Sequence, residues 1–342
     1  MEKIKAFLKR KNIIISAKRY GIDALGAMAQ GLFASLLIGT IISTIGEQAG
    51  IQLLVDIGGY AKAATGPAMA ISIGFALQCP PLVLFSLAAV GVAANTLGGA
   101  GGPLAVLIVT IFAAEFGKAV SKETKIDIIV TPFVTIFIGA GLSIWWAPAI
   151  GAAASAVGNA IMWATELQPF FMGILVSVIV GIALTLPISS AAICAALGLT
   201  GLAGGAAVAG CCANMVGFAV MSFRENRWGG LISQGLGTSM LQMPNIVKNP
   251  KIWLAPTLAS MVTGPVSTMV FKLENIAAGS GMGTCGLVGP IGVYTAMPEG
   301  GASMWMGILM VCFLLPAVLT LLFGWFFRRI GWIREGDLKL DL

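Results

Sequence analysis

Histidine is absent from all 342 residues of the sequence. Its absence excludes a Ser-His-Asp triad, a histidine-ligated metal and a phosphohistidine on this chain. There is also no GxxxxGK[ST] phosphate loop, which argues against ATP hydrolysis. The six cysteines lie in apolar or glycine-rich surroundings without CxxC spacing, so we expect buried thiols. We therefore predict no metal, no cofactor and no self-contained catalytic site.

Charge is also scarce. Only 10% of the residues are charged, whereas an ordinary soluble domain has about 25%. The apolar share is 58%, and residues 304–327 form a run without charge that is long enough to cross a bilayer. We predict an all-α, polytopic membrane protein with about 8–10 transmembrane helices, forming a single domain over residues 1–342.

The basic residues indicate topology rather than nucleic-acid binding, because they cluster beside apolar segments. Residues 1–20 have the pattern of an amphipathic helix at a cytoplasmic surface. Arg328, Arg329 and Arg334 follow the last apolar run, in a predicted cytoplasmic tail over 328–342. We expect both termini on the cytoplasmic side of a bacterial plasma membrane, with no signal peptide removed.

The first crossing is predicted at 22–45 and the last at 304–327. Between them we expect crossings at 51–77, 81–95, 103–120, 126–146, 170–187, 201–221 and 252–271. The parity of crossings between residues 146 and 221 does not close, which predicts a half-crossing or a hairpin there.

Several apolar segments are broken by proline and glycine. Two milder breaks lie at 74–85 and 185–193. A kink or tight turn explains the first as well as a ligand site does. In the second, the Ser189 and Ser190 hydroxyls can satisfy the carbonyls that Pro187 frees, which favours a structural role. Two others, at 229–245 and 274–301, are too glycine-rich for a continuous helix and too apolar for a solvated loop. We predict that both are re-entrant hairpins lining a polar cavity, with ordinary surface loops as the alternative.

Carboxylates at membrane depth are costly, so each is a functional candidate. Glu274 and Glu299 bracket the second glycine-rich segment and are predicted to face its cavity. Glu115 lies three residues before Lys118, a spacing that favours an ion pair on one helix face. The remaining candidates are Glu47, Asp56 and Glu166.

One family resemblance covers nearly the whole chain. The segments QPFFMGILVSVIVGIALTLPISSAAI, RENRWGGLISQGLGTSMLQMPNI and GMGTCGLVGPIGVYTAM resemble the membrane-embedded IIC component of the sugar phosphotransferase system, in its PfoR-like branch. The resemblance implies a homodimeric permease in which a transport domain with re-entrant hairpins moves against a scaffold. It also implies separate IIB and IIA phosphocarrier proteins as partners.

In related IIC proteins a glutamate, often with a histidine, contacts the sugar hydroxyls. The resemblance therefore implies that Glu299, in the PEGG segment, or Glu274 accepts a proton in the phosphorylation of a sugar. The predicted substrate-binding residues are Gln234, Gln242, Asn245, Thr284, Gly281 and Gly283. The enzyme role would be at most that of the membrane part of a PEP-dependent sugar phosphotransferase.

Two other functions remain open. A membrane sensor that keeps the permease fold would bind a ligand without net flux, and an uncoupled secondary transporter would move it without phosphorylation. An ion channel is a weaker alternative, because no filter-like motif is present. We expect a polar small molecule and the lipid bilayer as partners, and no nucleic acid.

Overall fold

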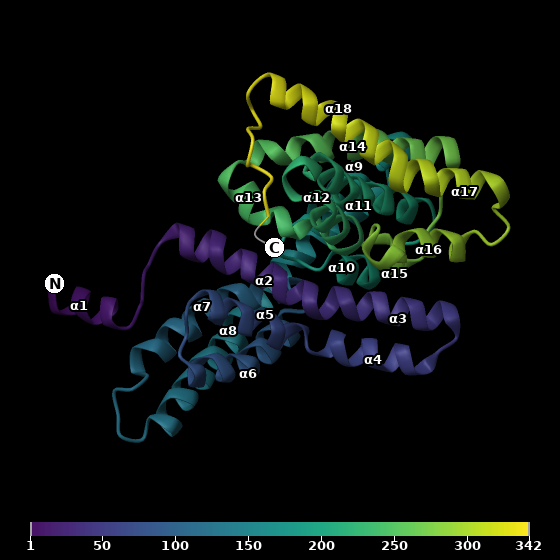
Figure 1. Cartoon of the computed structure of the whole chain (residues 1–342). Helices are drawn as coiled ribbons and strands as arrows, with labels where there is room; N and C mark the ends of the chain where they lie inside the picture. Colours follow the sequence, from purple (N-terminus) through teal and green to yellow (C-terminus); the bar gives the residue numbers. More distant parts are fainter. Residues whose placement is uncertain (1, 341–342) are drawn as a thin grey trace. The chain divides into compact units, whose positions relative to one another are not determined.

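The structure is a computed structural model that describes residues 2–340 (Figure 1). These residues form helices and no strand, apart from one isolated bridge between Gly201 and Asn275. Six helices are long and apolar enough to cross a membrane: Arg19–Ala49, Pro81–Val120, Asp127–Thr165, Gly201–Met221, Pro250–Phe271 and Gly301–Arg329. The prediction of an all-α polytopic membrane protein is confirmed.

The predicted crossing at 51–77 is wrong. The structure has two helices there, α4 (Gln52–Ala63) and α5 (Thr65–Ala76), separated at Ala64. Pro67 lies in the first turn of α5, where no intrahelical partner for its missing N–H is needed. A continuous helix from α4 would require that N–H and would bring the proline ring against the preceding turn.

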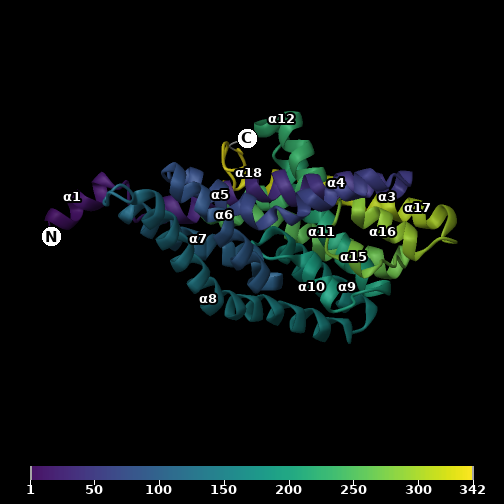
Figure 2. The same cartoon turned by 90° about the horizontal axis from the view of Figure 1, so that it is seen from below.

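The predicted end of a crossing at residue 146 is also too early. Helix α8 (Asp127–Thr165) has 39 residues and continues through Pro132 and Pro148 (Figure 2).

The chain divides into two compact units. Unit 1 comprises Met1–Gly39 and Asp56–Ala153, and unit 2 comprises Thr40–Val55 and Ala154–Leu342. Helices α3 (Ile38–Ala49), α4 and α8 each contribute residues to both. The expectation of a single membrane domain remains a prediction.

In unit 1, α5 packs between α2 (Ala24–Leu32) and α6 (Pro81–Gly98), and α7 (Gly102–Val120) packs on α6. Glycines make this packing close. A Cβ on Gly66 would lie 2.3 Å from the carbonyl oxygen of Gly91 on α6. Small residues that allow backbones to approach are the usual means of helix association in membranes. The other elements are α1 (Glu2–Arg10), η1 (Arg19–Asp23), η2 (Phe33–Leu37) and η3 (Gly99–Gly101).

Unit 2 is built around α11 (Gly201–Met221), whose bounds coincide with the predicted crossing at 201–221. This helix is apolar on all sides, and it packs against α9 (Pro169–Thr185), α14 (Leu254–Pro265) and α18 (Leu315–Arg329). A helix that is hydrophobic all round is expected to be buried. At the α9 contact, a Cβ on Gly210 would lie 1.8 Å from the Ser177 carbonyl oxygen, so only glycine fits.

Short and broken helices fill the rest of unit 2. Seven-residue α10 (Ser190–Ala196) lies in the stretch for which an incomplete crossing was predicted. The first glycine-rich segment forms α12 (Phe223–Ile232), η4 (Ser233–Gly237), η5 (Ser239–Gln242) and α13 (Met243–Lys248), followed by η6 (Pro250–Trp253). The second forms α15 (Ala277–Ser280), η8 (Cys285–Leu287) and α16 (Val288–Ala296). The remaining elements are η7 (Val266–Phe271), α17 (Gly301–Leu309) and η9 (Met310–Leu314).

Candidate functional site

Three broken segments of unit 2 meet through polar contacts. The hydroxyl of Thr185, at the end of α9, lies 2.7 Å from the hydroxyl of Ser239 in the first glycine-rich segment. The Ser190 hydroxyl, at the start of α10, donates to the Gly281 carbonyl at 2.7 Å. The Thr284 hydroxyl donates to the Gly235 carbonyl, which links the two glycine-rich segments directly. Breaks that are far apart in the sequence therefore form one polar region.

Three of the predicted substrate-binding residues form a ladder of buried amides in this region. The Gln242 Nε2 group donates to Gln234 Oε1 at 2.9 Å, and Asn245 Nδ2 donates to Gln242 Oε1 at 2.9 Å. Gln234 and Gln242 are fully buried, and Asn245 is 5% exposed. Gln234 Nε2 also donates to the Ser222 hydroxyl and the Gly230 carbonyl, both at 2.9 Å. We call Gln234, Gln242 and Asn245 the amide ladder.

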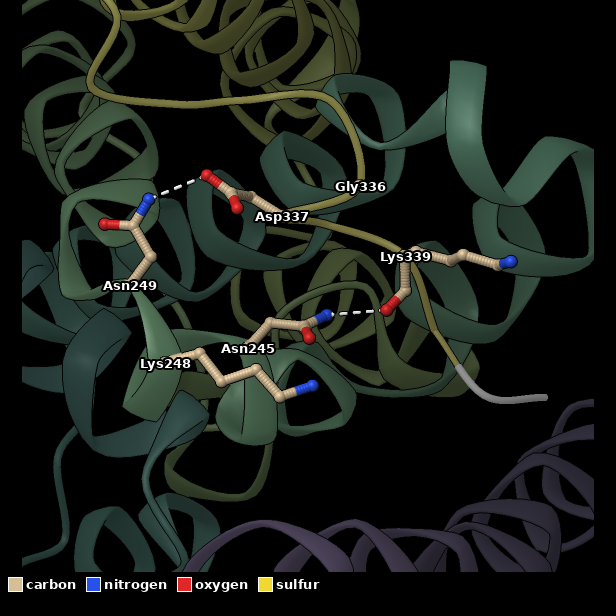
Figure 3. A pocket seen from close by; sticks show the side chains of 6 residues that line it. All are labelled: Asn245, Lys248, Asn249, Gly336, Asp337 and Lys339. Atoms are coloured by element: carbon tan, nitrogen blue, oxygen red, sulfur yellow. Dashed lines mark hydrogen bonds between the residues drawn. The ribbon is translucent and has the colours of Figure 1, made fainter. Parts of the chain in front are cut away.

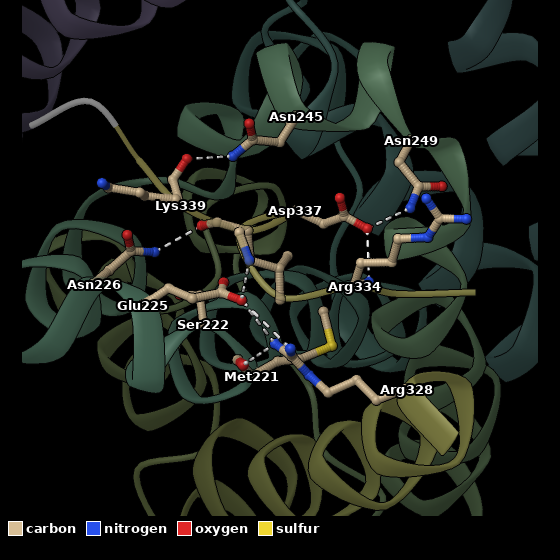
Figure 4. A network of polar contacts seen from close by, with 12 residues as sticks. Met221, Ser222, Glu225, Asn226, Asn245, Asn249, Arg328, Arg334, Asp337 and Lys339 are labelled. Carbon is tan, nitrogen blue, oxygen red and sulfur yellow. Dashed lines mark hydrogen bonds and ion pairs between the residues drawn. The ribbon is translucent and has the colours of Figure 1, made fainter. Parts of the chain in front are cut away.

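The C-terminal tail completes the amide ladder. Gln242 Nε2 donates to the Leu338 carbonyl at 3.0 Å, and Asn245 Nδ2 donates to the Lys339 carbonyl at 2.8 Å. An amide group has two N–H donors, so every N–H of the ladder has an acceptor in this conformation. The Leu338 side chain is fully buried. The tail therefore covers the ladder and is not a free solvated segment. Figures 3 and 4 show its contact with the ladder between Asn245 and Lys339.

Further side chains fix the tail at both ends (Figure 4). Glu225 Oε1 pairs with Arg328 at 3.3 Å and accepts the backbone N–H of Gly336 at 3.1 Å. Asn226 donates to the Leu338 carbonyl and accepts the Leu340 N–H, each at 2.8 Å. Residues 341–342 of the predicted cytoplasmic tail lie outside the described residues.

A small polar pocket of about 210 Å³ lies between α13 and the tail (Figure 3). Its lining residues are Asn245, Lys248, Asn249, Gly336, Asp337 and Lys339. Asp337 is held in place because Asn249 Nδ2 and the Arg334 N–H both donate to its Oδ2 atom at 2.8 Å. The pocket thus adjoins the outer end of the amide ladder.

Gly281 and Gly283, which were predicted to bind substrate, lie where the chain packs closely. A Cβ on Gly281 would lie 2.6 Å from the Ser190 carbonyl oxygen, and one on Gly283 would lie 2.8 Å from the Cys211 side chain. Gly283 also has φ +55°, which non-glycine residues rarely adopt. These contacts explain why both positions are glycine, while a direct role in substrate binding stays a prediction.

The two predicted proton acceptors differ from the amide ladder in their exposure. Glu274 and Glu299 are both exposed, and neither side chain has a hydrogen bond or ion pair with the described part of the chain. The backbone N–H of Glu274 donates to the side-chain sulfur of Met297 at 3.2 Å. In this conformation no hydrogen bond or ion pair joins either carboxylate to the amide ladder, and their role as proton acceptors stays a prediction.

The sequence analysis missed a second buried polar cluster centred on Asn214 in α11. Asn214 is fully buried and accepts from the Trp253 indole at 3.1 Å and from the Thr185 hydroxyl at 3.3 Å. It donates to the Ser260 hydroxyl at 3.3 Å. A lone asparagine in an otherwise apolar crossing was the available signal, because polar groups at membrane depth are expected to be paired or functional.

A metal centre has no support in the described residues: no three histidine, cysteine or acidic side chains group together. Five of the six cysteines are buried, and all six are free thiols. The polar groups of this region are neutral amides and hydroxyls, which donate and accept hydrogen bonds. The three ladder residues themselves supply no nucleophile or base.

A family model described as "Phosphotransferase system, EIIC" matches residues 22–340. The chain belongs to this family. The match includes both glycine-rich segments, the amide ladder and the tail as far as the described residues extend. Neither a curated protein nor a solved structure matches the chain.

Family and fold together make the chain a multi-pass membrane protein and a sugar-permease component of the phosphotransferase system. Membership of this family implies a sugar substrate and, in general, IIB and IIA proteins as partners. The expected resemblance to the EIIC component is confirmed, while its PfoR-like branch remains a prediction.

Proposed function

We propose that this EIIC component imports a polar sugar by alternating access, and that a separate IIB protein phosphorylates the sugar as it reaches the cytoplasm. In this proposal Gln234, Gln242, Asn245 and Thr284 contact the sugar. The observation that carries the proposal is the amide ladder, a row of buried hydrogen-bonding groups on broken helices. A homodimer with both termini in the cytoplasm is part of the same proposal.

Amide side chains suit a sugar because each offers donors and an acceptor to a hydroxyl group. A buried site that pairs with hydroxyls also discriminates strongly, since an analogue without them leaves the amides unpaired. In the present conformation the Leu338 and Lys339 carbonyls accept the ladder's N–H groups. We infer that these carbonyls take the places of sugar hydroxyl oxygens, so the tail must withdraw when sugar binds.

The proton released from the sugar hydroxyl during phosphorylation needs an acceptor. We propose that Glu299 or Glu274 fills this role in a conformation that brings it to the sugar. Glu299 lies between α16 and α17, in a stretch where the chain is not helical from 297 to 300. Such a connection can shift without breaking helical hydrogen bonds, which supports the proposal.

Uptake into proteoliposomes tests the function. The purified chain is reconstituted with IIB, IIA, the general phosphoryl-donor proteins and phosphoenolpyruvate enclosed in the lumen, and a panel of labelled sugars is added outside. The proposal expects one sugar to accumulate as its phosphate only with the donors. Equal accumulation of free sugar without donors would instead indicate an uncoupled transporter.

A sensor is the second candidate, and the docked tail favours it specifically. If sugar displaces the tail from the amide ladder, occupancy of the site becomes visible at the C-terminus without any transport. A sensor would bind a sugar and release the tail, and yet show no flux in the same proteoliposomes.

A further inference from the structure

Unit 1 contains a second pocket, of about 380 Å³, that has no part in the proposed sugar path. Four cationic side chains and one carboxylate line it: Arg10, Lys11, Lys118, Lys122 and Glu123. The other lining residues are Asn12, Gln78, Pro80 and Ser121. Positive charge thus prevails in a concave, polar site, which is the electrostatic requirement for binding an anion.

Three helices end at this pocket, namely α1, α5 and α7. Just beyond each end lies a non-glycine residue with positive φ: Asn12 (φ 53°), Gln78 (φ 56°) and Lys122 (φ 59°). The described chain has six such residues, so half of them line this one pocket. A left-handed backbone is unfavourable for a residue other than glycine, and such residues are concentrated at functional sites.

Part of the positive charge serves the fold. Lys118 is 1% exposed and donates to the Asn12 carbonyl at 3.0 Å and the Leu77 carbonyl at 3.2 Å, while pairing with Glu115 at 2.7 Å. Arg19 donates to the same Leu77 carbonyl. These cations satisfy carbonyls at helix C-termini, where positive charge is favourable. The predicted ion pair between Glu115 and Lys118 is present, with Lys118 buried and Glu115 partly buried.

Lys11 also serves a helix end, because it donates to the Ser121 carbonyl just past α7 and pairs with Glu123. Arg10 and Lys122 serve no helix end. Arg10 pairs with Glu123 at 2.8 Å and has a 62% exposed side chain, so several of its N–H groups remain available. The Lys122 ammonium has no hydrogen bond or ion pair with the residues described; only its backbone N–H is bound, by Asp127 at 2.6 Å. The Gln78 side chain accepts from Asn12 at 2.6 Å, which leaves its NH₂ group unused within the same part of the chain.

We propose that this pocket binds a phosphate group, with Lys122, Arg10 and the Gln78 amide as its ligands. A phosphate offers three or more acceptor oxygens and negative charge, which match two cations and a neutral donor. Two sources carry this chemistry: a soluble phosphate or phosphate ester, and the headgroup of an anionic phospholipid. By the positive-inside rule Lys118, Lys122 and Lys125 are expected at the cytoplasmic surface, which both sources can reach.

The soluble source is tested by thermal unfolding of the full chain in a neutral detergent. Inorganic phosphate is titrated at ionic strength matched with sodium chloride. We expect a saturable rise in the unfolding midpoint for the native chain. Lys122→Gln and Arg10→Gln each remove one charge-assisted contact and should raise the apparent Kd about tenfold or more. Lys125→Gln is the matched control, since Lys125 is exposed on the same loop and does not line the pocket.

The lipid source is tested by native mass spectrometry of the same variants with phosphatidylglycerol or phosphatidylcholine. If the native chain and Lys125→Gln retain one phosphatidylglycerol, and Lys122→Gln and Arg10→Gln lose it, the pocket binds the lipid headgroup. Saturable binding of phosphate with the same pattern assigns it to a soluble ligand. The proposal is overturned if neither binds, or if Lys125→Gln loses as much as Lys122→Gln. A single cooperative unfolding transition in chloride alone shows that each variant folds.

Discussion

Gln242 is the central residue of the amide ladder, because it bonds to both of the other amides and to the tail. Gln242→Met keeps the size and removes these bonds, leaving partners unsatisfied at a cost of about 1–3 kcal/mol each. We expect the tail to be released. In a Leu338→Cys background, thiol labelling at residue 338, located by mass spectrometry, should become at least about tenfold faster.

The matched control for this variant is Gln168→Met, at the exposed residue that precedes α9. It should leave the labelling of residue 338 slow. Equal labelling rates in the Gln242→Met and native backgrounds would mean that the ladder does not hold the tail.

Glu299 and Glu274 are distinguished by single substitutions to glutamine. The residue that accepts the proton should lose about 100-fold or more of phosphorylated product when substituted, the usual range for a general base. Since both side chains are exposed, the unfolding midpoint should not change for either. Glu166→Gln, at another exposed glutamate, serves as the control. Full activity in both Glu299→Gln and Glu274→Gln would remove both residues from the mechanism.

Glu123, which lines the proposed phosphate pocket, makes the stability of the folded chain depend on pH. Hydrogen bonding from Lys11 and the nearby charge of Arg10 hold the pKa of Glu123 below its ordinary value of 4.5. A carboxyl group whose pKa is lower in the folded than in the unfolded chain stabilises the fold at pH values above its ordinary pKa. This stabilisation is lost as the pH falls through the folded-state pKa. The midpoint difference between native and Glu123→Gln chains should be present at neutral pH and shrink below 4.5. A difference that is constant with pH would contradict this ion pair.

Helix packing depends on a few glycines whose backbone contacts leave no room for a side chain. Gly210→Ala should destabilise the chain by about 1–3 kcal/mol through overpacking of α11 on α9, because the new Cβ would lie 1.8 Å from the Ser177 carbonyl oxygen. Gly141→Ala, in the exposed part of α8 with nothing within 4 Å, should be neutral or stabilising. Thermal unfolding in detergent measures both. Equal midpoints for the two variants would contradict the close approach of α9 and α11.

Long apolar crossings could be predicted from the sequence, and tight breaks could not be predicted fully. The bounds of α11 follow from an uninterrupted apolar run between Gly201 and Met221. The break at Ala64 was missed because apolar residues continue across it, although Pro67 in the next turn was a usable signal. The hydrophobic pattern reports burial in lipid, which a turn between two packed helices does not interrupt.

The three residues of the amide ladder were predicted to bind substrate, which stays a prediction, whereas their bonds to one another and to the tail were not predicted. Gln234, Gln242 and Asn245 stood out as amides in an apolar, broken segment, and the structure joins them. The tail binds through the main-chain carbonyls of Leu338 and Lys339, some 94–96 residues away in the sequence. Every residue carries such a carbonyl, so no side-chain pattern marks the contact.

For the molecule as a whole, fold and family agree on a membrane-embedded permease component. We propose that the amide ladder of unit 2 is the sugar site. The most direct measurement is donor-dependent accumulation of labelled sugar phosphate in proteoliposomes, comparing the native chain, Gln242→Met and Gln168→Met. We expect accumulation with the native chain and Gln168→Met, and a loss of at least about tenfold with Gln242→Met. Native-level accumulation with a folded Gln242→Met chain would contradict the account.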